Sequence, residues 1–299
     1  MRTPRRRFPI HTWMGVAILA IAQAGIAAGH PLAATWHTPV SWTGYILAVD
    51  GVVARASGHS WLTTRRREAP FLVLASIGIW LLFEAYNFHL KNWAYVGLPA
   101  DPRIRDIGYG WSFATILPGV FETADLVYLI AHRSPWRSSS QPPRTSAFRQ
   151  SLSVLAGLTM VVLPLLLPEA VAAYLFGSVW LGFFFLVDPA NERLGAPSLV
   201  RSWRAGHRWP ARSLLLAGAV CGLLWETWNY QAFRANGAHW VYLVPDGLRP
   251  FGLHFGKMPV LGLLGFLPFA LELFALYHFL KTALGMDRLL RDESVGAFR

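Results

Sequence analysis

Two segments of this chain place a glutamate in an apolar stretch, with an asparagine three residues later. Glu84 is followed by Asn87, and Glu226 is followed by Asn229. Residues three apart share one face of a helix, so each carboxylate and amide can act together. Ionisable groups inside apolar helices face a bundle interior or a cavity and are functional candidates. The repeated pair predicts either a reactive carboxylate site or a hydrogen-bonded joint between helices.

A second pair of glutamates is expected deeper in the membrane. Glu122 and Glu272 each follow a proline by four residues, and a proline frees a backbone carbonyl one turn earlier. A neutral carboxylic acid there can donate a proton, and a second carboxylate can accept one. Hydrogen bonds between helices, worth about 0.6–2 kcal/mol each, are the structural alternative. We expect Glu272 and Glu122 to act as acid and base, with Glu226 and Glu84 stabilising charge.

Other residues repeat in the same order around these glutamates. Asp50 and Asp188 each precede an arginine by five residues, which a local ion pair or a loop cap explains. A Trp-x-Tyr segment follows each asparagine, and it predicts a loop folded over the bundle mouth. Aromatic residues at the membrane interface are the alternative explanation. The aromatic residues expected to contact a ligand, together with the two Trp-x-Tyr segments, are Phe83, Tyr86, Trp93, Tyr95, Trp225, Trp228, Trp240 and Tyr242.

The composition predicts an integral membrane protein. Of the 299 residues 54% are hydrophobic and 14% are charged, and 14 are tryptophan. Several apolar runs reach roughly 18–22 residues, enough to cross a bilayer as a helix. We expect an all-α protein with about eight transmembrane helices, near residues 10–29, 40–56, 70–88, 109–131, 150–167, 171–188, 212–230 and 258–280.

The internal repeat predicts two parallel four-helix units. Residues 1–132 form the first unit, 133–149 a cytoplasmic linker, 150–283 the second unit and 284–299 a cytoplasmic tail. Because each unit has an even number of spans, both enter the membrane in the same direction. The Ser/Pro/Arg composition of the linker is typical of a flexible segment.

The net charge of +11 is concentrated between alternate spans. The positive-inside rule then places both termini in the cytoplasm, and we expect a cell inner membrane with an uncleaved first helix. Anionic lipid headgroups at the cytoplasmic face are the expected partners of these cations. A nucleic-acid partner is not expected, because no soluble basic domain is apparent.

The sequence predicts no cofactor and no metal. Its histidines are scattered, and none has the spacing of a hydrolytic zinc site. Cys221 is the only cysteine, so an intrachain disulfide or a thiolate cluster cannot form. No phosphate loop or dinucleotide fingerprint is present.

The order of motifs resembles the membrane-embedded lycopene cyclase domain. Trp225-Glu226, then Trp240-Val241-Tyr242, then Phe255-Gly256-Lys257-Met258-Pro259 follow the order of that family. The family's Pro-x-Glu-Glu pair would fall on Leu261 and Gly262, so it is missing here. The resemblance implies a tandem membrane fold, with the active acid moved or the activity lost.

Two functions follow from these patterns. The resemblance implies an intramembrane enzyme that cyclises or isomerises an isoprenoid or another membrane lipid, as in carotenoid biosynthesis. Aromatic rings would stabilise the carbocation that protonation creates. The alternative is a non-enzymatic transporter, channel or accessory subunit whose carboxylates bind a proton, a cation or a lipid headgroup.

Overall fold

The computed structural model describes residues 6–132 and 144–290. Arg2 and Arg5, most of the expected linker 133–149 and the end of the expected tail 284–299 lie outside these residues. The protein is 75% helical, which confirms the all-α prediction. The long helices are α1 (Ile10–Ala27), α2 (Pro31–Ser57), α3 (Glu68–Leu90), α4 (Pro102–Ala114), α5 (Ile116–His132), α6 (Ala147–Leu166), α8 (Phe176–Leu194), α10 (Trp209–Arg234) and α11 (Val260–Ala283).

The shorter elements lie between the long helices or after them. They are the helices α7 (Glu169–Ala172), α9 (Leu199–Arg204) and α12 (Met286–Leu289), the 3-10 turns η1 (Asp246–Leu248) and η2 (Pro250–Gly252), and the strands β1 (Trp93–Val96), β2 (His239–Tyr242), β3 (His254–Phe255) and β4 (Met258–Pro259).

Within residues 6–132 and 144–290, five helical segments are long and apolar enough, by length and composition, to cross a membrane. A chain with several such segments is a membrane protein. They are Ile10–Ala27, Glu68–Leu90, Pro102–Ala131, Ala147–Leu166 and Val260–Ala283.

The expected spans differ from the helices in three places. The span expected at 40–56 lies in a longer helix, α2, which begins nine residues earlier at Pro31. The predicted span 109–131 is divided between α4 and α5, which separate at Thr115. Pro118 has no N–H to donate to the carbonyl of Ala114, where α4 ends, so the helix is weakest there. In the second half, α8 begins only at Phe176, after the single turn of α7, rather than at residue 171.

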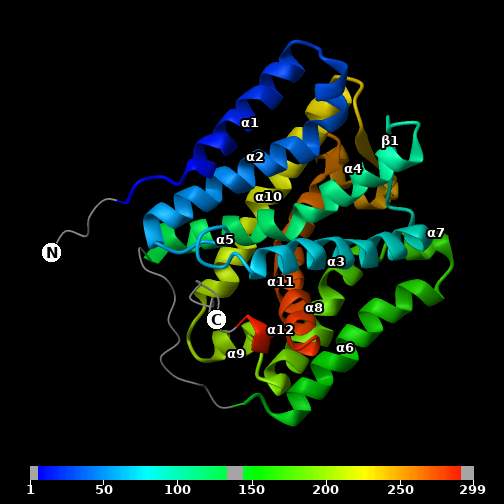
Figure 1. Ribbon diagram of the computed structural model, residues 1–299. Helices are drawn as coiled ribbons and strands as arrows, with labels where there is room; N and C mark the ends of the chain where they lie inside the picture. The colour runs from blue at the N-terminus through cyan, green and yellow to red at the C-terminus, as the bar shows by residue number, and fades with distance from the viewer. Residues whose placement is uncertain (1–5, 133–143, 291–299) are drawn as a thin grey trace.

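Two helix pairs flank a central group of helices (Figure 1). On one side α1 packs along α2, and on the other α6 packs along α8, while α3, α5, α10 and α11 lie between them. Both flanking pairs come together at glycines. A Cβ added at Gly15 would lie 2.5 Å from the Gly44 carbonyl oxygen, and one at Gly157 would lie 2.7 Å from that of Gly182. Small residues let helix backbones approach this closely in membranes.

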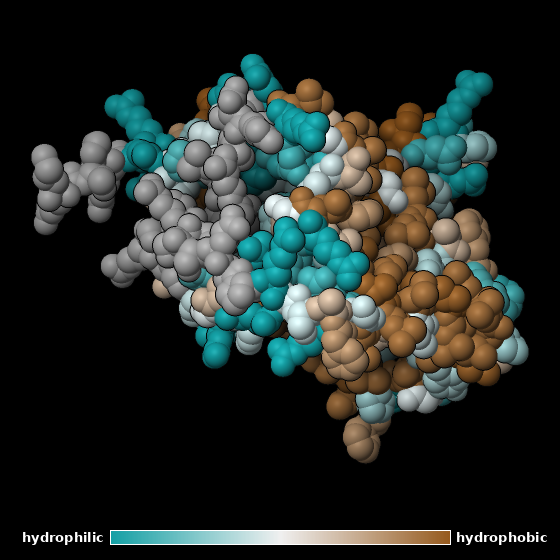
Figure 2. Space-filling model, turned by 90° about the horizontal axis from the view of Figure 1, so that it is seen from below, coloured by the Kyte–Doolittle hydropathy of each residue, from teal (hydrophilic) through white to brown (hydrophobic). Residues whose placement is uncertain are grey.

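The outer surface of the flanking helices is apolar. Six leucines of α6 are exposed, namely Leu152, Leu155, Leu158, Leu163, Leu165 and Leu166. Figure 2 shows such residues gathered on one side of the molecule, with polar residues on the other side. An extended exposed apolar surface is expected of a protein that faces lipid.

Two short two-stranded sheets join the helices. Strand β1 pairs antiparallel with β2, so the two Trp-x-Tyr segments meet although they are far apart in the sequence. Strand β3 pairs with β4 immediately before α11. The prediction of a folded-back loop is confirmed for both halves, and the two loops form one structure.

Candidate functional site

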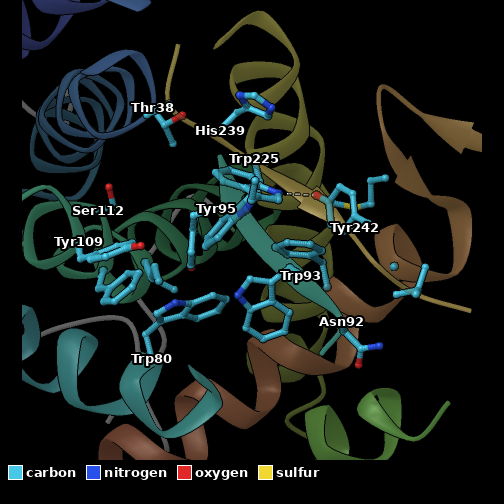
Figure 3. Close-up of a pocket in the computed structure, with 18 of the residues that line it drawn as sticks. Thr38, Trp80, Asn92, Trp93, Tyr95, Tyr109, Ser112, Trp225, His239 and Tyr242 are labelled. Atoms are coloured by element: carbon cyan, nitrogen blue, oxygen red, sulfur yellow. Dashed lines mark hydrogen bonds between the residues drawn. The ribbon is translucent and has the colours of Figure 1, made fainter. Parts of the chain in front are cut away.

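A cavity of about 340 Å³ lies beside the β1–β2 sheet, among α2, α3, α4, α8, α10 and α11. Its wall is largely aromatic (Figure 3), and few polar groups reach it. Such a cavity suits an apolar ligand held by ring faces. The aromatic side chains in the wall are Trp36, Trp42, Trp80, Trp93, Tyr95, Tyr109, Phe113, Tyr174, Phe176, Trp180, Trp225, Trp240, Tyr242 and Phe266.

Glu84 lies one layer behind this wall and binds three of its side chains. One carboxylate oxygen, Oε1, accepts hydrogen bonds from the indole N–H of Trp80 at 2.8 Å and of Trp93 at 3.1 Å. The same oxygen accepts the hydroxyl proton of Tyr95 at 2.5 Å. The carboxylate thus orients three rings of the cavity wall.

Glu226 is fully buried and has a corresponding role on α10. Its Oε2 accepts a hydrogen bond from the Tyr242 hydroxyl at 2.8 Å, and that hydroxyl accepts one from the Trp240 indole at 2.7 Å. Its Oε1 accepts the backbone N–H of Lys257 at 2.5 Å. Gly256, at φ +58°, permits this approach, because a Cβ there would lie 2.4 Å from Oε1.

The two asparagines fix the strands. Asn87 accepts a hydrogen bond from the N–H of Trp93 at 3.2 Å and donates one to its carbonyl at 2.9 Å. Asn229 does the same to Trp240, at 2.9 Å and 3.1 Å. Each side-chain amide replaces a neighbouring strand as the partner of a tryptophan backbone. The asparagines therefore hold the two strands of the β1–β2 sheet in place, and neither asparagine lines the cavity.

The two cavity tyrosines that bind glutamates, Tyr95 and Tyr242, remain protonated near neutral pH. Burial raises the pKa of Tyr95 well above its usual value, and the charge of Glu84 adds to this. Burial also raises the pKa of Tyr242, with the charge of Glu226 as the next cause. A protonated phenol that is hydrogen-bonded to a carboxyl group can pass a proton between that group and a bound molecule.

The remaining aromatic residues predicted for the site lie elsewhere, with one exception. Trp225 lines the cavity. Phe83 is fully buried against Phe183 and Phe269, and Tyr86 donates its hydroxyl to the Val161 carbonyl. Trp228 packs on Trp42 with ring centroids 4.8 Å apart. These three residues are packing side chains in the structure.

The deeper glutamates do not line the cavity either. Glu272 is fully buried, and its Oε1 accepts the backbone N–H of Phe183 at 2.8 Å. Glu122 is 1% exposed, and within the described residues neither of its carboxyl oxygens has a hydrogen-bond partner. It lies instead among the charged side chains of Asp50, Asp125 and Arg65.

Asp50 and Asp188 are loop caps with closely matching hydrogen bonds. Asp50 accepts the hydroxyl of Ser60 and the N–H of Leu62, both at 2.9 Å. Asp188 accepts the hydroxyl of Ser198 at 2.7 Å and the N–H groups of Leu199 and Val200. The alternative of an ion pair with the following arginine is not seen: Arg55 donates to a backbone carbonyl, and Arg193 to Gln150.

The sequence analysis missed several wall residues and one buried ionic network. Trp42 and Trp180 are separated in sequence by the same distance as Asp50 and Asp188, so the repeat could have identified them. The network joins Glu68 to Arg65 at 2.8 Å and to Lys281 at 2.7 Å. Arg65 and Glu68 stand three residues apart, but Lys281 joins them only through the fold, and no sequence pattern connects it to them.

The described residues contain no group of three or more His, Cys, Asp or Glu side chains that could hold a metal ion. No protein-family model, no curated protein and no solved structure matches this chain.

Proposed function

We propose that this chain forms eight membrane spans in two parallel repeats, with both termini in the cytoplasm of a cell whose inner membrane holds it. Matching interactions support the repeat. They are the loop caps of Asp50 and Asp188, the hydrogen bonds by which Asn87 and Asn229 hold the backbones of Trp93 and Trp240, and the glycine contacts of the α1–α2 and α6–α8 helix pairs. The β1–β2 register supports a two-fold axis between the units, because it pairs the repeated residues Ala94 and Val241 with each other.

We propose further that the protein binds an isoprenoid in the aromatic cavity and isomerises it by proton transfer. The observation that carries this proposal is the position of two tyrosine hydroxyls. Tyr95 and Tyr242 belong to the cavity wall, and each hydroxyl is hydrogen-bonded to a glutamate behind it. This assigns the proton chemistry to Glu84 and Glu226, rather than to Glu122 and Glu272.

The proposed reaction moves one proton onto the ligand and another off it. In one tyrosine–glutamate pair the glutamate starts as a neutral carboxylic acid and is the proton source: the tyrosine hydroxyl passes its proton to a carbon–carbon double bond while it takes the proton of the acid, which becomes a carboxylate. In the second pair the glutamate starts as a carboxylate. The carbocation forms in the cavity beside Trp80 and Trp225, which pack on each other in the wall with centroids 5.5 Å apart, and ring faces stabilise cations. A proton from a neighbouring carbon leaves to the second tyrosine–glutamate pair. The product is an isomer of the substrate, cyclised where the chain folds back on itself.

The test is deuterium incorporation in isolated membranes. Membranes from cells that have accumulated lycopene and expressed the protein are incubated in D2O, without further isoprenoid synthesis, and extracted isoprenoids are analysed by mass spectrometry. Because the new C–H bond takes its hydrogen from water, the product carries deuterium at carbon. We expect labelling with the wild type and its loss in a Tyr95→Phe, Tyr242→Phe double variant.

The control is Tyr230→Phe, because Tyr230 lies on α10, the helix that carries Glu226, but does not line the cavity. It should label as the wild type does. If the wild-type protein is folded in the membrane and no isoprenoid is labelled, the reaction is excluded.

A second function is supported by Glu122. A buried carboxyl group with no hydrogen-bond partner in the described chain, next to two other acids, fits a proton-binding site in a transporter or accessory subunit. Proton uptake by proteoliposomes that is lost in Glu122→Gln, with no isoprenoid labelling by the wild type, would favour this function.

A further inference from the structure

The polar groups of the cavity wall are distributed unevenly. Arg105, Tyr109 and Ser112 all line it from α4 and stand four and three residues apart, on one face of that helix. On the second-half side the wall holds no Lys or Arg; apart from its aromatic residues and the imidazole of His239 it is apolar, with Val244, Leu248, Met258, Pro259 and Leu261. The cavity therefore has a cationic side and an apolar side, although the repeat makes its aromatic residues nearly symmetric.

Arg105 is the one Lys or Arg side chain in this wall, and no Asp or Glu accompanies it. Within residues 6–132 and 144–290, no hydrogen bond, ion pair or ring contact of its guanidinium is seen. Other arginines of the described chain have polar partners: the buried Arg65 binds Glu68, and the exposed Arg193 binds Gln150. An arginine of intermediate exposure beside an apolar cavity is expected to have an anionic partner.

We infer that the ligand of this cavity is an amphiphile with one anionic group, held by Arg105, and an apolar chain, held by the aromatic wall. The inference rests on the proposed isoprenoid function. It narrows the substrate from isoprenoids in general to prenyl phosphates or similar isoprenoid anions. Tyr109 and Ser112 add hydroxyl donors beside the guanidinium. A symmetric hydrocarbon would leave all three groups unused.

The inference can be tested with the full chain in nanodiscs of uncharged phosphatidylcholine. Quenching of tryptophan fluorescence reports binding, since several tryptophans line the cavity. The probes are geranylgeranyl phosphate, geranylgeraniol and inorganic phosphate. We expect the prenyl phosphate to bind about tenfold more tightly than the alcohol, which corresponds to one charge-assisted contact. Arg105→Gln should remove this preference and leave alcohol binding unchanged.

Arg103→Gln is the matched control. Arg103 lies two residues earlier on the same helix, is exposed and does not line the cavity. If Arg103→Gln reduces the preference as much as Arg105→Gln, the effect is general surface charge and the inference is overturned. Equal binding of alcohol and phosphate by the wild type overturns it also. Inorganic phosphate that binds as tightly as the prenyl phosphate would show a free-anion site and overturn the amphiphile assignment.

The outcomes separate this inference from the proposed reaction. If the preference for the prenyl phosphate depends on Arg105 but no isoprenoid is labelled with deuterium, the inference of an anionic ligand stands and the isomerase reaction is excluded. Labelling of a neutral isoprenoid, with no phosphate preference, would retain the isomerase and exclude the anionic ligand.

Discussion

Tyr95 lies directly opposite Trp240 in the β1–β2 ladder, and the repeat gives the ladder a second pair of the same kind, Trp93 opposite Tyr242. Since side chains alternate between the faces of a strand, all four rings point to one face, toward the cavity. Aromatic cross-strand pairs contribute roughly 0.2–1 kcal/mol each. Each of the two repeats thus supplies one residue of each aromatic pair, so neither repeat can form this part of the cavity wall alone.

The paired hydrogen bonds from Asn87 to Trp93 and from Asn229 to Trp240 should be essential to the β1–β2 sheet. Asn229→Ala removes the partners of both backbone groups of Trp240, and two lost hydrogen bonds cost about 2–3 kcal/mol. Hydrogen exchange should be markedly faster at the Trp240 amide. Thr227→Ala, at a half-buried position on the same helix whose hydroxyl donates to the Leu223 carbonyl, should change exchange little. Equal protection of Trp240 in both variants would contradict this role of the Asn229 hydrogen bonds.

The buried ionic network should stabilise the fold far more than a surface ion pair. The Lys281 side chain is 8% exposed and lies 2.7 Å from Glu68. Lys281→Met leaves an under-compensated buried carboxylate and should cost about 3–5 kcal/mol. Lys91→Met breaks a pair of similar length whose lysine is 59% exposed, and should cost only about 0–1 kcal/mol. Unfolding in detergent measures both, and comparable losses would refute the distinction.

The contact between α10 and α11 depends on a glycine. A Cβ at position 218 would lie 2.1 Å from the Phe266 carbonyl oxygen, so Gly218→Ala should destabilise the protein by about 1–3 kcal/mol. At Gly78 on α3 a Cβ meets nothing within 4 Å. Gly78→Ala should therefore be neutral or stabilising by up to about 1 kcal/mol, as alanine favours a helix over glycine. Opposite signs of the two changes in melting temperature are the expected result.

The tie between α3 and α7 should weaken in acid. A hydrogen bond from Lys91, at 2.6 Å, lowers the pKa of the Glu169 carboxyl. A group whose pKa is lowered by folding stabilises the protein above its unfolded pKa and loses that effect as the pH falls through its folded pKa. The melting temperatures of wild type and Glu169→Gln should differ at neutral pH and converge in acid. A gap that widens on acidification would show that another interaction dominates.

The site was predictable from the sequence where the repeat marked it. Glu84, Glu226 and the Trp-x-Tyr segments stood out because polar and aromatic residues recur together, and the structure brings them to one cavity. Which buried acids face the cavity was not predictable in the same way. Glu122 and Glu272 are buried as expected, but the packing of their helices places neither of them in the cavity wall.

Contacts between elements distant in sequence could not be predicted. Glu68 and Lys281 stand near helix ends, where a charged residue normally reaches the membrane surface. Only the packing of α3 against α11 turns them toward each other. The break between α4 and α5 was similarly hidden, because hydropathy reads the whole of Pro102–Ala131 as one apolar segment.

The pairing of Ala94 with Val241 makes a covalent latch possible. Directly opposed residues of an antiparallel ladder have Cβ atoms about 4.5–5.5 Å apart, within small adjustments of disulfide geometry. Since Cys221 is buried and is the only native thiol, Ala94→Cys with Val241→Cys would add one crosslink without a competing accessible partner. Oxidation would lock the two loops together and reduction would release them. The crosslink could be formed before or after a ligand is added. If ligand binds only when it is added before oxidation, the ligand enters the cavity by separation of the β1–β2 sheet.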